Sequence, residues 1–147
     1  MTEFENYINK MSKYSPILLR TGIAIVFLWF GFSQISNPSA WVRLLPEFTK
    51  SFFISSISLI YLNGFFEITF ATLLLLGLFT RVTSFLLGAH LLMISYSLGY
   101  GPVAARDLSL AIATFAIFLH GADEFCLDKI IFIKKKLFEK QENSEKV

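Results

Sequence analysis

A single carboxyl group inside a long apolar run is the strongest chemical signal in this sequence. Only seven of the hundred residues from Thr21 to His120 are Asp, Glu, Lys or Arg, and five of these fall at expected turns. Glu67 does not. An ionisable group at the depth of a lipid bilayer is costly, faces the interior of a helix bundle and needs a partner. We therefore interpret Glu67 as a candidate catalytic residue, with a structural carboxyl bonded to a neighbouring helix as the alternative.

His90 is the predicted partner of Glu67. The second apolar segment is expected to enter the membrane from outside near residue 54, and the third from inside near residue 82. At 1.5 Å of rise per residue, both side chains then lie near the midplane of the bilayer. A carboxyl group and an imidazole at the same depth are suited to exchanging a proton. A histidine with a purely structural role is the alternative.

The remaining polar residues of the apolar segments form stripes, because residues seven apart share a helix face. Asn63 lies one turn from Glu67, and the other polar residues cluster near the two membrane surfaces. We expect Arg20 to approach Arg81 at the inner surface, and Gln34 to approach Arg106 or Asp107 at the outer one. Arg81 could instead serve the turn and the orientation, and Arg106 and Asp107 could form only a helix-start pair. The candidate binding residues are Arg20, Gln34, Asn63, Arg81, Arg106 and Asp107.

The composition places this polar set in a membrane protein. The chain is 54% hydrophobic and 16% charged, against about 25% charged residues in soluble domains. Four apolar segments approach the roughly 20 residues that a helix needs to cross the hydrocarbon core. Strand-like alternation is absent, so helices are expected. The predicted fold is an all-α, integral-membrane four-helix bundle, with spans at about residues 16–36, 54–78, 82–98 and 103–120.

Two further segments flank the bundle. Residues 1–15 are predicted to form a short interfacial helix, because Thr2 and Glu5 have capping-box spacing and the apolar residues make one stripe. Residues 16–121 form the predicted four-span bundle. Residues 122–147 are predicted to be a basic amphipathic tail on an anionic membrane surface, with a solvated tail that only orients the protein as the alternative.

The Lys and Arg residues predict the orientation. Ten of the 13 lie on the side that holds both termini, and three lie on the other side. By the positive-inside rule, both termini are cytoplasmic and residues 37–53 are external. The predicted location is the inner membrane, as a multi-pass protein.

Several other chemistries lack their sequence signals. Cys126 is the single cysteine, which excludes an intrachain disulfide. No Cys and His cluster has zinc spacing, so no metal is predicted. No phosphate loop or dinucleotide fingerprint is present, and nucleic-acid binding has no support beyond the lysine run.

The motifs resemble those of the DoxX family of small four-helix membrane proteins. The matching pieces cover roughly residues 16–128 and include Gly64-Phe65-Phe66-Glu67, Leu76-Gly77-Leu78-Phe79-Thr80-Arg81 and Arg106-Asp107-Leu108. The namesake branch is similar to the membrane subunits of thiosulfate:quinone oxidoreductase. By analogy, the resemblance implies Arg20, Glu67, Arg81, Arg106 and Asp107 as family positions.

The resemblance and the polar layers together give three functional hypotheses. The first is a subunit of a membrane redox system that binds a quinone or another small apolar molecule. Its expected partner is a soluble or membrane redox protein, and the chain could also form a homo-oligomer. The second is a non-enzymatic assembly or scaffold protein. The third is a transporter of a small molecule or protons. An apolar pocket against Glu67 and His90 would favour the first, a dry core the second, and a continuous polar path from Arg20 to Asp107 the third.

Overall fold

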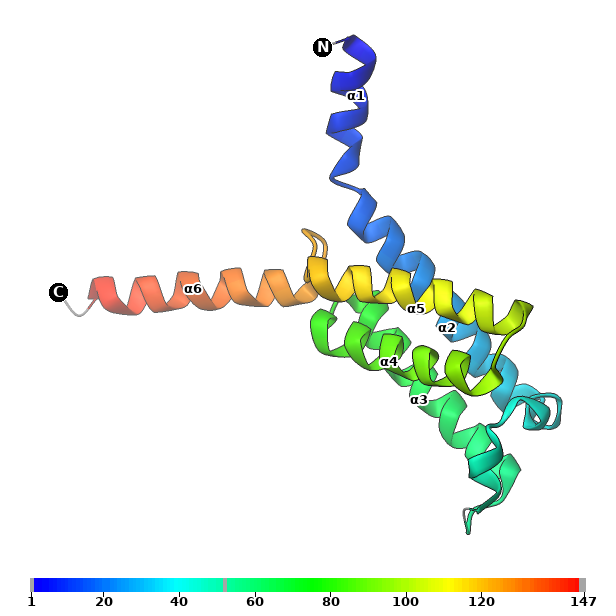
Figure 1. Cartoon of the computed structure of the whole chain (residues 1–147). Coiled ribbons are helices and arrows are strands. Elements are labelled where there is room, and N and C mark those ends of the chain that lie inside the picture. The colour runs from blue at the N-terminus through cyan, green and yellow to red at the C-terminus, as the bar shows by residue number, and fades with distance from the viewer. Residues whose placement is uncertain (1, 52, 146–147) are drawn as a thin grey trace.

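The computed structural model describes residues 2–51 and 53–145 and is an all-α membrane bundle (Figure 1). Within the described residues, four helices are long and apolar enough to cross a membrane, which confirms the predicted spans. Short 3₁₀ turns, η1 to η3, connect the first two spans. The elements are α1 (Glu3–Ser12), α2 (Ser15–Ser36), η1 (Pro38–Ala40), η2 (Val42–Leu44), η3 (Glu47–Ser51), α3 (Ser56–Leu76), α4 (Thr80–Leu98), α5 (Pro102–His120) and α6 (Leu127–Glu145).

The bundle has two ends, and the polar residues are best located relative to them. Both α1 and α6 leave the bundle at one end, which we call the terminal end (Figure 1). The short turn between α3 and α4 also lies there. The opposite end, which we call the loop end, carries residues 37–51 and 53–55 and the turn between α4 and α5.

The four spans associate as two close pairs, α2 with α3 and α4 with α5. Small residues permit the close approach, as is usual between helices in lipid. A Cβ atom added to Gly31 would lie 2.9 Å from the carbonyl oxygen of Gly64, so α2 and α3 meet backbone to backbone. In the second pair, Gly88 lies against the ring of Phe115. Contacts between α3 and α4 are fewer, which leaves a looser seam between the pairs.

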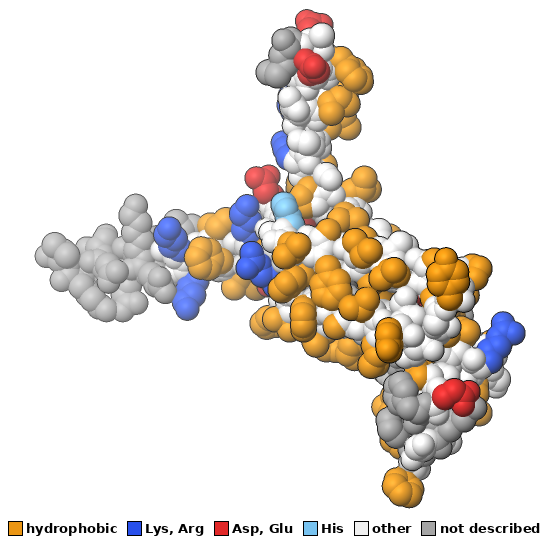
Figure 2. All heavy atoms as spheres, viewed as in Figure 1, with side chains coloured by type: hydrophobic (Ala, Val, Ile, Leu, Met, Phe, Trp, Pro, Cys, Tyr) orange, Lys and Arg blue, Asp and Glu red, His pale blue; other side chains and the backbone are white. Residues whose placement is uncertain are grey.

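The outer surface of the bundle is what a lipid environment requires. Large apolar side chains such as Trp29, Phe65 and Leu119 are mostly exposed. Figure 2 shows hydrophobic side chains covering one face of the bundle, with charged side chains near its ends and on α1 and α6. This distribution, together with the helix lengths, makes the chain a multi-pass membrane protein.

The flanking helices project from the bundle. In α1, the predicted capping box is present: the Thr2 hydroxyl accepts from the Glu5 backbone N–H at 3.3 Å, and Glu5 accepts from the Thr2 N–H at 2.7 Å. No described residue of α1 is buried. In α6, the apolar residues from Ile130 to Ile133 are exposed, and so are the lysines from Lys134 to Lys136.

Candidate functional site

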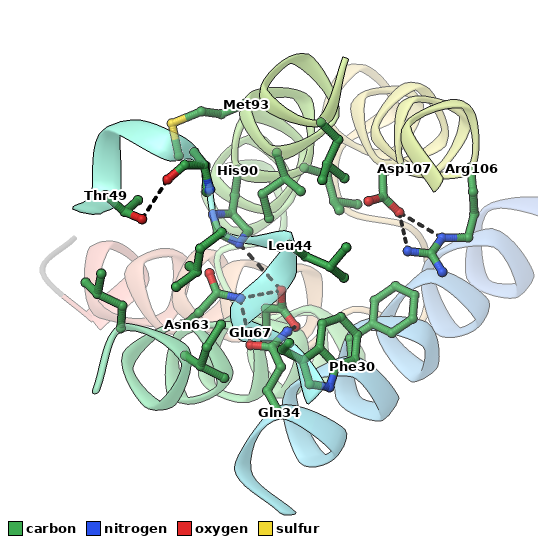
Figure 3. Close-up of a pocket in the computed structure, with 18 residues that line it drawn as sticks. Phe30, Gln34, Leu44, Thr49, Asn63, Glu67, His90, Met93, Arg106 and Asp107 are labelled. Carbon is green, nitrogen blue, oxygen red and sulfur yellow. Dashed lines mark hydrogen bonds and ion pairs between the residues drawn. The ribbon is translucent and has the colours of Figure 1, made fainter. Parts of the chain in front are cut away.

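Glu67 is the centre of a buried polar cluster on α2 and α3. Its carboxylate is 2% exposed. Oε2 accepts a hydrogen bond from Gln34 Nε2 at 2.9 Å, and Oε1 accepts one from Asn63 Nδ2 at 2.9 Å. Asn63 Nδ2 also donates to Gln34 Oε1 at 2.7 Å, which closes a ring of three side chains (Figure 3). The predicted inward orientation of Glu67 is therefore confirmed, and two amides rather than a cation satisfy its oxygens.

His90 faces this cluster from α4, across the seam between the two helix pairs. Its Nε2 lies 3.5 Å from Glu67 Oε1, so the predicted approach of the two groups is confirmed. The imidazole also packs against Phe66, with ring centroids 4.9 Å apart. Nε2 is buried, yet among the described residues it has no hydrogen-bond partner. A buried polar atom without a partner is uncommon and calls for an explanation such as a ligand.

Arg106 and Asp107 lie at the start of α5, near the loop end. Arg106 Nε and Nη2 both lie 2.8 Å from Asp107 Oδ1. The guanidinium is half exposed and stands 4.9 Å from the centroid of Phe30, whereas Asp107 is buried. Gln34 bonds to Asn63 and Glu67 rather than to this pair, but all of them line one cavity.

That cavity, with a volume of about 220 Å³, lies between the helix pairs at the loop end. Its polar wall is formed by Gln34, Asn63, Glu67 and His90, and Arg106 with Asp107 lie at another side (Figure 3). The other walls are mainly apolar and include Phe30, Leu44, Leu45, Leu59, Ile60, Leu91, Met93, Ile94 and Leu98.

The loop between α2 and α3 supplies the end wall of the cavity. Trp41 of this loop is held by a hydrogen bond from its Nε1 to Ser33 Oγ at 3.3 Å and by edge contact with Phe30. The sequence predicted only that this loop packs at the membrane interface. Its participation in a cavity depends on the contacts that η1 and η2 make with α3, for which a single sequence carries no signal.

Arg20 lies at the terminal end, away from the cavity, and its predicted approach to Arg81 is wrong. Its Nε donates to Asp123 Oδ2 at 2.7 Å, and its Nη1 donates to the carbonyl oxygens of Leu74 and Leu75 at 2.7 and 2.6 Å. A buried guanidinium needs a carboxylate and cannot be matched by a second arginine. Arg81 is exposed and lies over Gly121 instead.

Asp123 and Asp128 are the polar residues that the sequence reasoning missed. Burial tends to raise the pKa of Asp123, but the hydrogen bond from Arg20, the Phe125 amide and the charge of Arg20 outweigh it and lower the pKa. Asp128 accepts from the backbone N–H groups of Phe79 and Thr80, both at 2.8 Å, and so caps α4. The sequence did contain one signal for Asp123: Arg20 in the first span needs an acidic partner, and such a partner can lie outside the spans.

Cys126 is buried in the connection between α5 and α6. Its thiol lies under the Gly77 turn, where a Cβ atom at Gly77 would come within 2.8 Å of the sulfur. Burial raises the pKa of the thiol, which keeps it in the neutral form. Among the described residues, no group of three or more His, Cys, Asp or Glu side chains could hold a metal ion.

Fold and site together define a polytopic helical membrane protein with a buried carboxylate beside a small apolar cavity. The family model for DoxX matches residues 15–99, which span α2 to α4 and contain Gln34, Asn63, Glu67 and His90. The chain therefore belongs to the DoxX family, as the motifs predicted. Arg106 and Asp107 lie beyond the matched range. Searches of curated proteins and of solved structures gave no significant match.

Proposed function

We propose that this protein is an inner-membrane subunit of a redox system and that it binds a quinone-type ring in the loop-end cavity. The observation that carries the proposal is the buried Nε2 of His90, which has no hydrogen-bond partner among the described residues and lies on the wall of a mainly apolar cavity, 3.5 Å from the carboxylate of Glu67. An apolar pocket against these two residues is the feature that distinguishes this hypothesis from the alternatives.

The size and lining of the cavity fit a single substituted ring. A dry apolar cavity of about 150 Å³ accommodates benzene, and the present cavity of about 220 Å³ is somewhat larger. Apolar walls with a few convergent polar groups are the usual composition of a small-molecule site. The His90 imidazole can donate a hydrogen bond to a ring oxygen, while aliphatic residues such as Leu91 and Ile94 contact the ring.

The proposed mechanism assigns the proton chemistry to His90 and Glu67. Reduction of a quinone to a quinol consumes two electrons, supplied by a redox partner or a reducing substrate, and two protons, one supplied by His90 and one taken up from water by the second ring oxygen. His90 Nε2 orients the ring oxygen and delivers a proton to it. Glu67 Oε1, 3.5 Å from Nε2, can return a proton to the imidazole. Gln34 and Asn63 hold the carboxylate in place through their amide hydrogen bonds.

The transport alternative is disfavoured by an apolar layer between the two polar clusters. Ala24, Phe27, Ala71 and Leu87 are at most 1% exposed and belong to the core that separates Arg20 from Glu67. The buried hydroxyls of Thr83 and Thr114 bond to backbone carbonyl oxygens three or four residues earlier in the chain rather than to one another. The scaffold alternative would be favoured by a dry core, and the cavity beside Glu67 argues against it.

The proposed orientation places both termini in the cytoplasm. The lysine-rich start of α6 and Arg81 lie at the terminal end, whereas Arg43 and Arg106 lie at the loop end. Under this assignment the cavity lies in the outer half of the bilayer.

Quinone binding can be tested with the protein's own tryptophans. Trp41 lines the cavity, whereas Trp29 is 73% exposed on the outer surface, so a Trp29→Phe protein reports on the cavity alone. We expect a short-chain benzoquinone to quench Trp41 saturably in nanodiscs, and a His90→Leu substitution to weaken that binding. Native mass spectrometry of the purified protein, combined with quinone extraction, provides an independent measurement. Linear, non-saturating quenching and a quinone-free preparation would leave the scaffold role as the better explanation.

A further inference from the structure

The position of Met93 shows where the cavity reaches the surface. On α4, Gly88 faces Phe115 of α5, whereas His90 faces Phe66 of α3. At 100° per residue, Met93 lies beyond His90 on the flank that faces α3. Met93 lines the cavity and yet is 52% exposed. The cavity therefore extends to the lipid-facing surface of α4.

The opposite side of this opening is formed by α3. Leu59 and Asn63 line the cavity there and are half buried. One turn closer to the terminal end, Phe66 packs on both His90 and Phe70, with ring centroids 4.9 and 4.6 Å apart, and closes the seam. The opening is thus confined to the part of the α3–α4 seam between Phe66 and the loop end.

The loop between α2 and α3 lies over the loop end of the cavity. Leu44, Leu45 and Pro46 lie against the cavity, and Trp41 anchors this part of the loop to Ser33. In Figure 3, Met93 lies near His90, whereas Arg106 lies beside Asp107 at another side of the cavity. The Arg106 side of the cavity holds an ion pair with Asp107.

We propose that the cavity opens sideways into the bilayer between α3 and α4, with Met93 at its mouth. The ligand enters from the lipid and is a ring molecule whose apolar chain leaves past Met93 and Leu59. The ring end lies against Glu67 and His90. Its identity as a quinone rests on the proposed function, whereas the lateral opening rests on the position and exposure of Met93. A cavity of about 220 Å³ holds a ring but not a long chain, so the chain must lie outside.

The test compares two ring probes in nanodiscs: a benzoquinone without a chain, and the same ring with a ten-carbon chain. Quenching of Trp41 in the Trp29→Phe protein reports binding. Met93→Phe adds rigid bulk at the mouth, and Leu92→Phe is the matched control, because Leu92 is 43% exposed but does not line the cavity. We expect Met93→Phe to weaken the chain-bearing probe by about tenfold, the usual scale of overpacking. The chainless probe lies against Glu67 and His90, so Met93→Phe should weaken it much less than the chain-bearing probe, and Leu92→Phe should change neither probe.

Equal effects of Met93→Phe on both probes, or no effect on either, would overturn the lateral opening while leaving ring binding intact. If neither probe quenches Trp41 in the parent, the proposed function fails, and lipids with brominated chains then decide the opening. The lateral opening would be supported if the brominated chains quench Trp41, if Met93→Phe reduces this quenching, and if Leu92→Phe leaves it unchanged. Equal quenching in all three proteins, or none, would reject it. Identical gel-filtration profiles exclude misfolding of the variants as the cause.

Discussion

Two buried ionisable side chains, Glu67 and Arg20, are stabilised by different partners. Arg20 has a carboxylate and two backbone carbonyl oxygens within hydrogen-bond distance. Glu67 has two side-chain amides and an imidazole 3.5 Å away, so no permanent positive charge is bonded to it. Among the described residues, Glu67 therefore lacks the permanent ion pair that holds Arg20. This difference is why the proposed proton chemistry is assigned to Glu67.

Substitutions of Glu67 separate a structural from a proton-carrying role. Glu67→Ala leaves the amide donors of Gln34 and Asn63 unpaired, so we expect a loss of ~1–3 kcal/mol per buried group. Glu67→Gln keeps the shape but replaces one accepting oxygen with a donor, so the Gln34 amide must turn, at a cost of about 1 kcal/mol. Thermal unfolding in detergent measures both. If Glu67 carries protons, the Gln variant folds but loses quinone reduction in native membranes; full activity would return Glu67 to a structural role.

Asp123 gives a prediction for the pH dependence of stability. Because its pKa is lowered below the ordinary 3.8 in the folded state, its contribution is present above pH 3.8. The contribution is lost as the pH falls from 3.8 through the lowered pKa. We expect Asp123→Ala to cost about 3–5 kcal/mol at neutral pH, since it leaves a buried guanidinium without its counter-ion. Its unfolding temperature should also vary less with pH below 3.8.

The control for this prediction is Glu124→Ala, because Glu124 is exposed and adjacent. It should leave both the unfolding temperature and its acid dependence close to those of the parent. An Asp123→Ala protein as stable as the Glu124→Ala protein would show that Arg20 is satisfied by the carbonyl oxygens of Leu74 and Leu75 alone.

Sequence reasoning identified the residues of the Glu67 cluster but not the partner of Arg20, for a physical reason. Glu67, Asn63 and His90 lie inside apolar helices, where the cost of burying a polar group restricts them to the bundle interior. Helical spacing then brings Asn63 beside Glu67. Asp123 lies in a connection, where neither periodicity nor hydropathy fixes its position. Its contact with Arg20 depends on how residues 121–127 fold back onto the bundle.

Helix ends were predictable where a local residue sets them. Thr2 caps α1, and Gly121 ends α5 in a positive-φ conformation that suits glycine; α3 ends at Leu76 before Gly77, also at positive φ, whereas the predicted span continued to residue 78. The start of α4 was not predictable. Phe79 adopts a left-handed conformation at its N-cap, and the capping oxygens come from Asp128, 48 residues away from Thr80. A cap supplied from a distant element leaves no signature in the local sequence.

The close contact between α2 and α3 gives a prediction at the scale of helices. A Cβ atom at Gly31 would lie 2.7 Å from Ile68 Cγ1 and 2.9 Å from the Gly64 carbonyl oxygen, whereas nothing lies within 4 Å of a Cβ atom at Gly22. We expect Gly31→Ala to push the helices apart and destabilise the protein by about 1–3 kcal/mol. Gly22→Ala, on the same helix, should be neutral or stabilising by up to about 1 kcal/mol.

The separation of α2 from α3 should also reach the site. Gln34 lies three residues after Gly31 and bonds to Glu67 across this contact. Gly31→Ala should therefore weaken ring binding measured by Trp41 quenching, and Gly22→Ala should not. Equal unfolding temperatures for the two variants would mean that the α2–α3 contact can relax around the added methyl group without a loss of stability.

At the scale of the whole molecule, the arrangement of two helix pairs explains where the site lies. Each pair is closely packed, and the polar groups that face the seam come from both: Gln34, Asn63 and Glu67 from the first, His90 and Asp107 from the second. The sequence predicted that four polar stripes converge, but it could not predict that the seam remains open at the loop end. The seam is open because the helices within each pair contact each other closely, whereas α3 and α4, which belong to different pairs, contact each other less.

The last prediction concerns the orientation of this asymmetric molecule in the membrane. If both termini are cytoplasmic, the loop end faces outward, as the distribution of Lys and Arg predicts. Cys126 cannot report on this, because it is fully buried and unreactive on either side. Ser39→Cys and Glu124→Cys place thiols at exposed positions of the loop end and the terminal end, respectively. A membrane-impermeant maleimide should label Ser39→Cys in intact cells and Glu124→Cys only after permeabilisation, and the parent should stay unlabelled throughout. The reverse pattern would place the cavity in the cytoplasmic half of the bilayer, and its ligand would then be drawn from the inner leaflet.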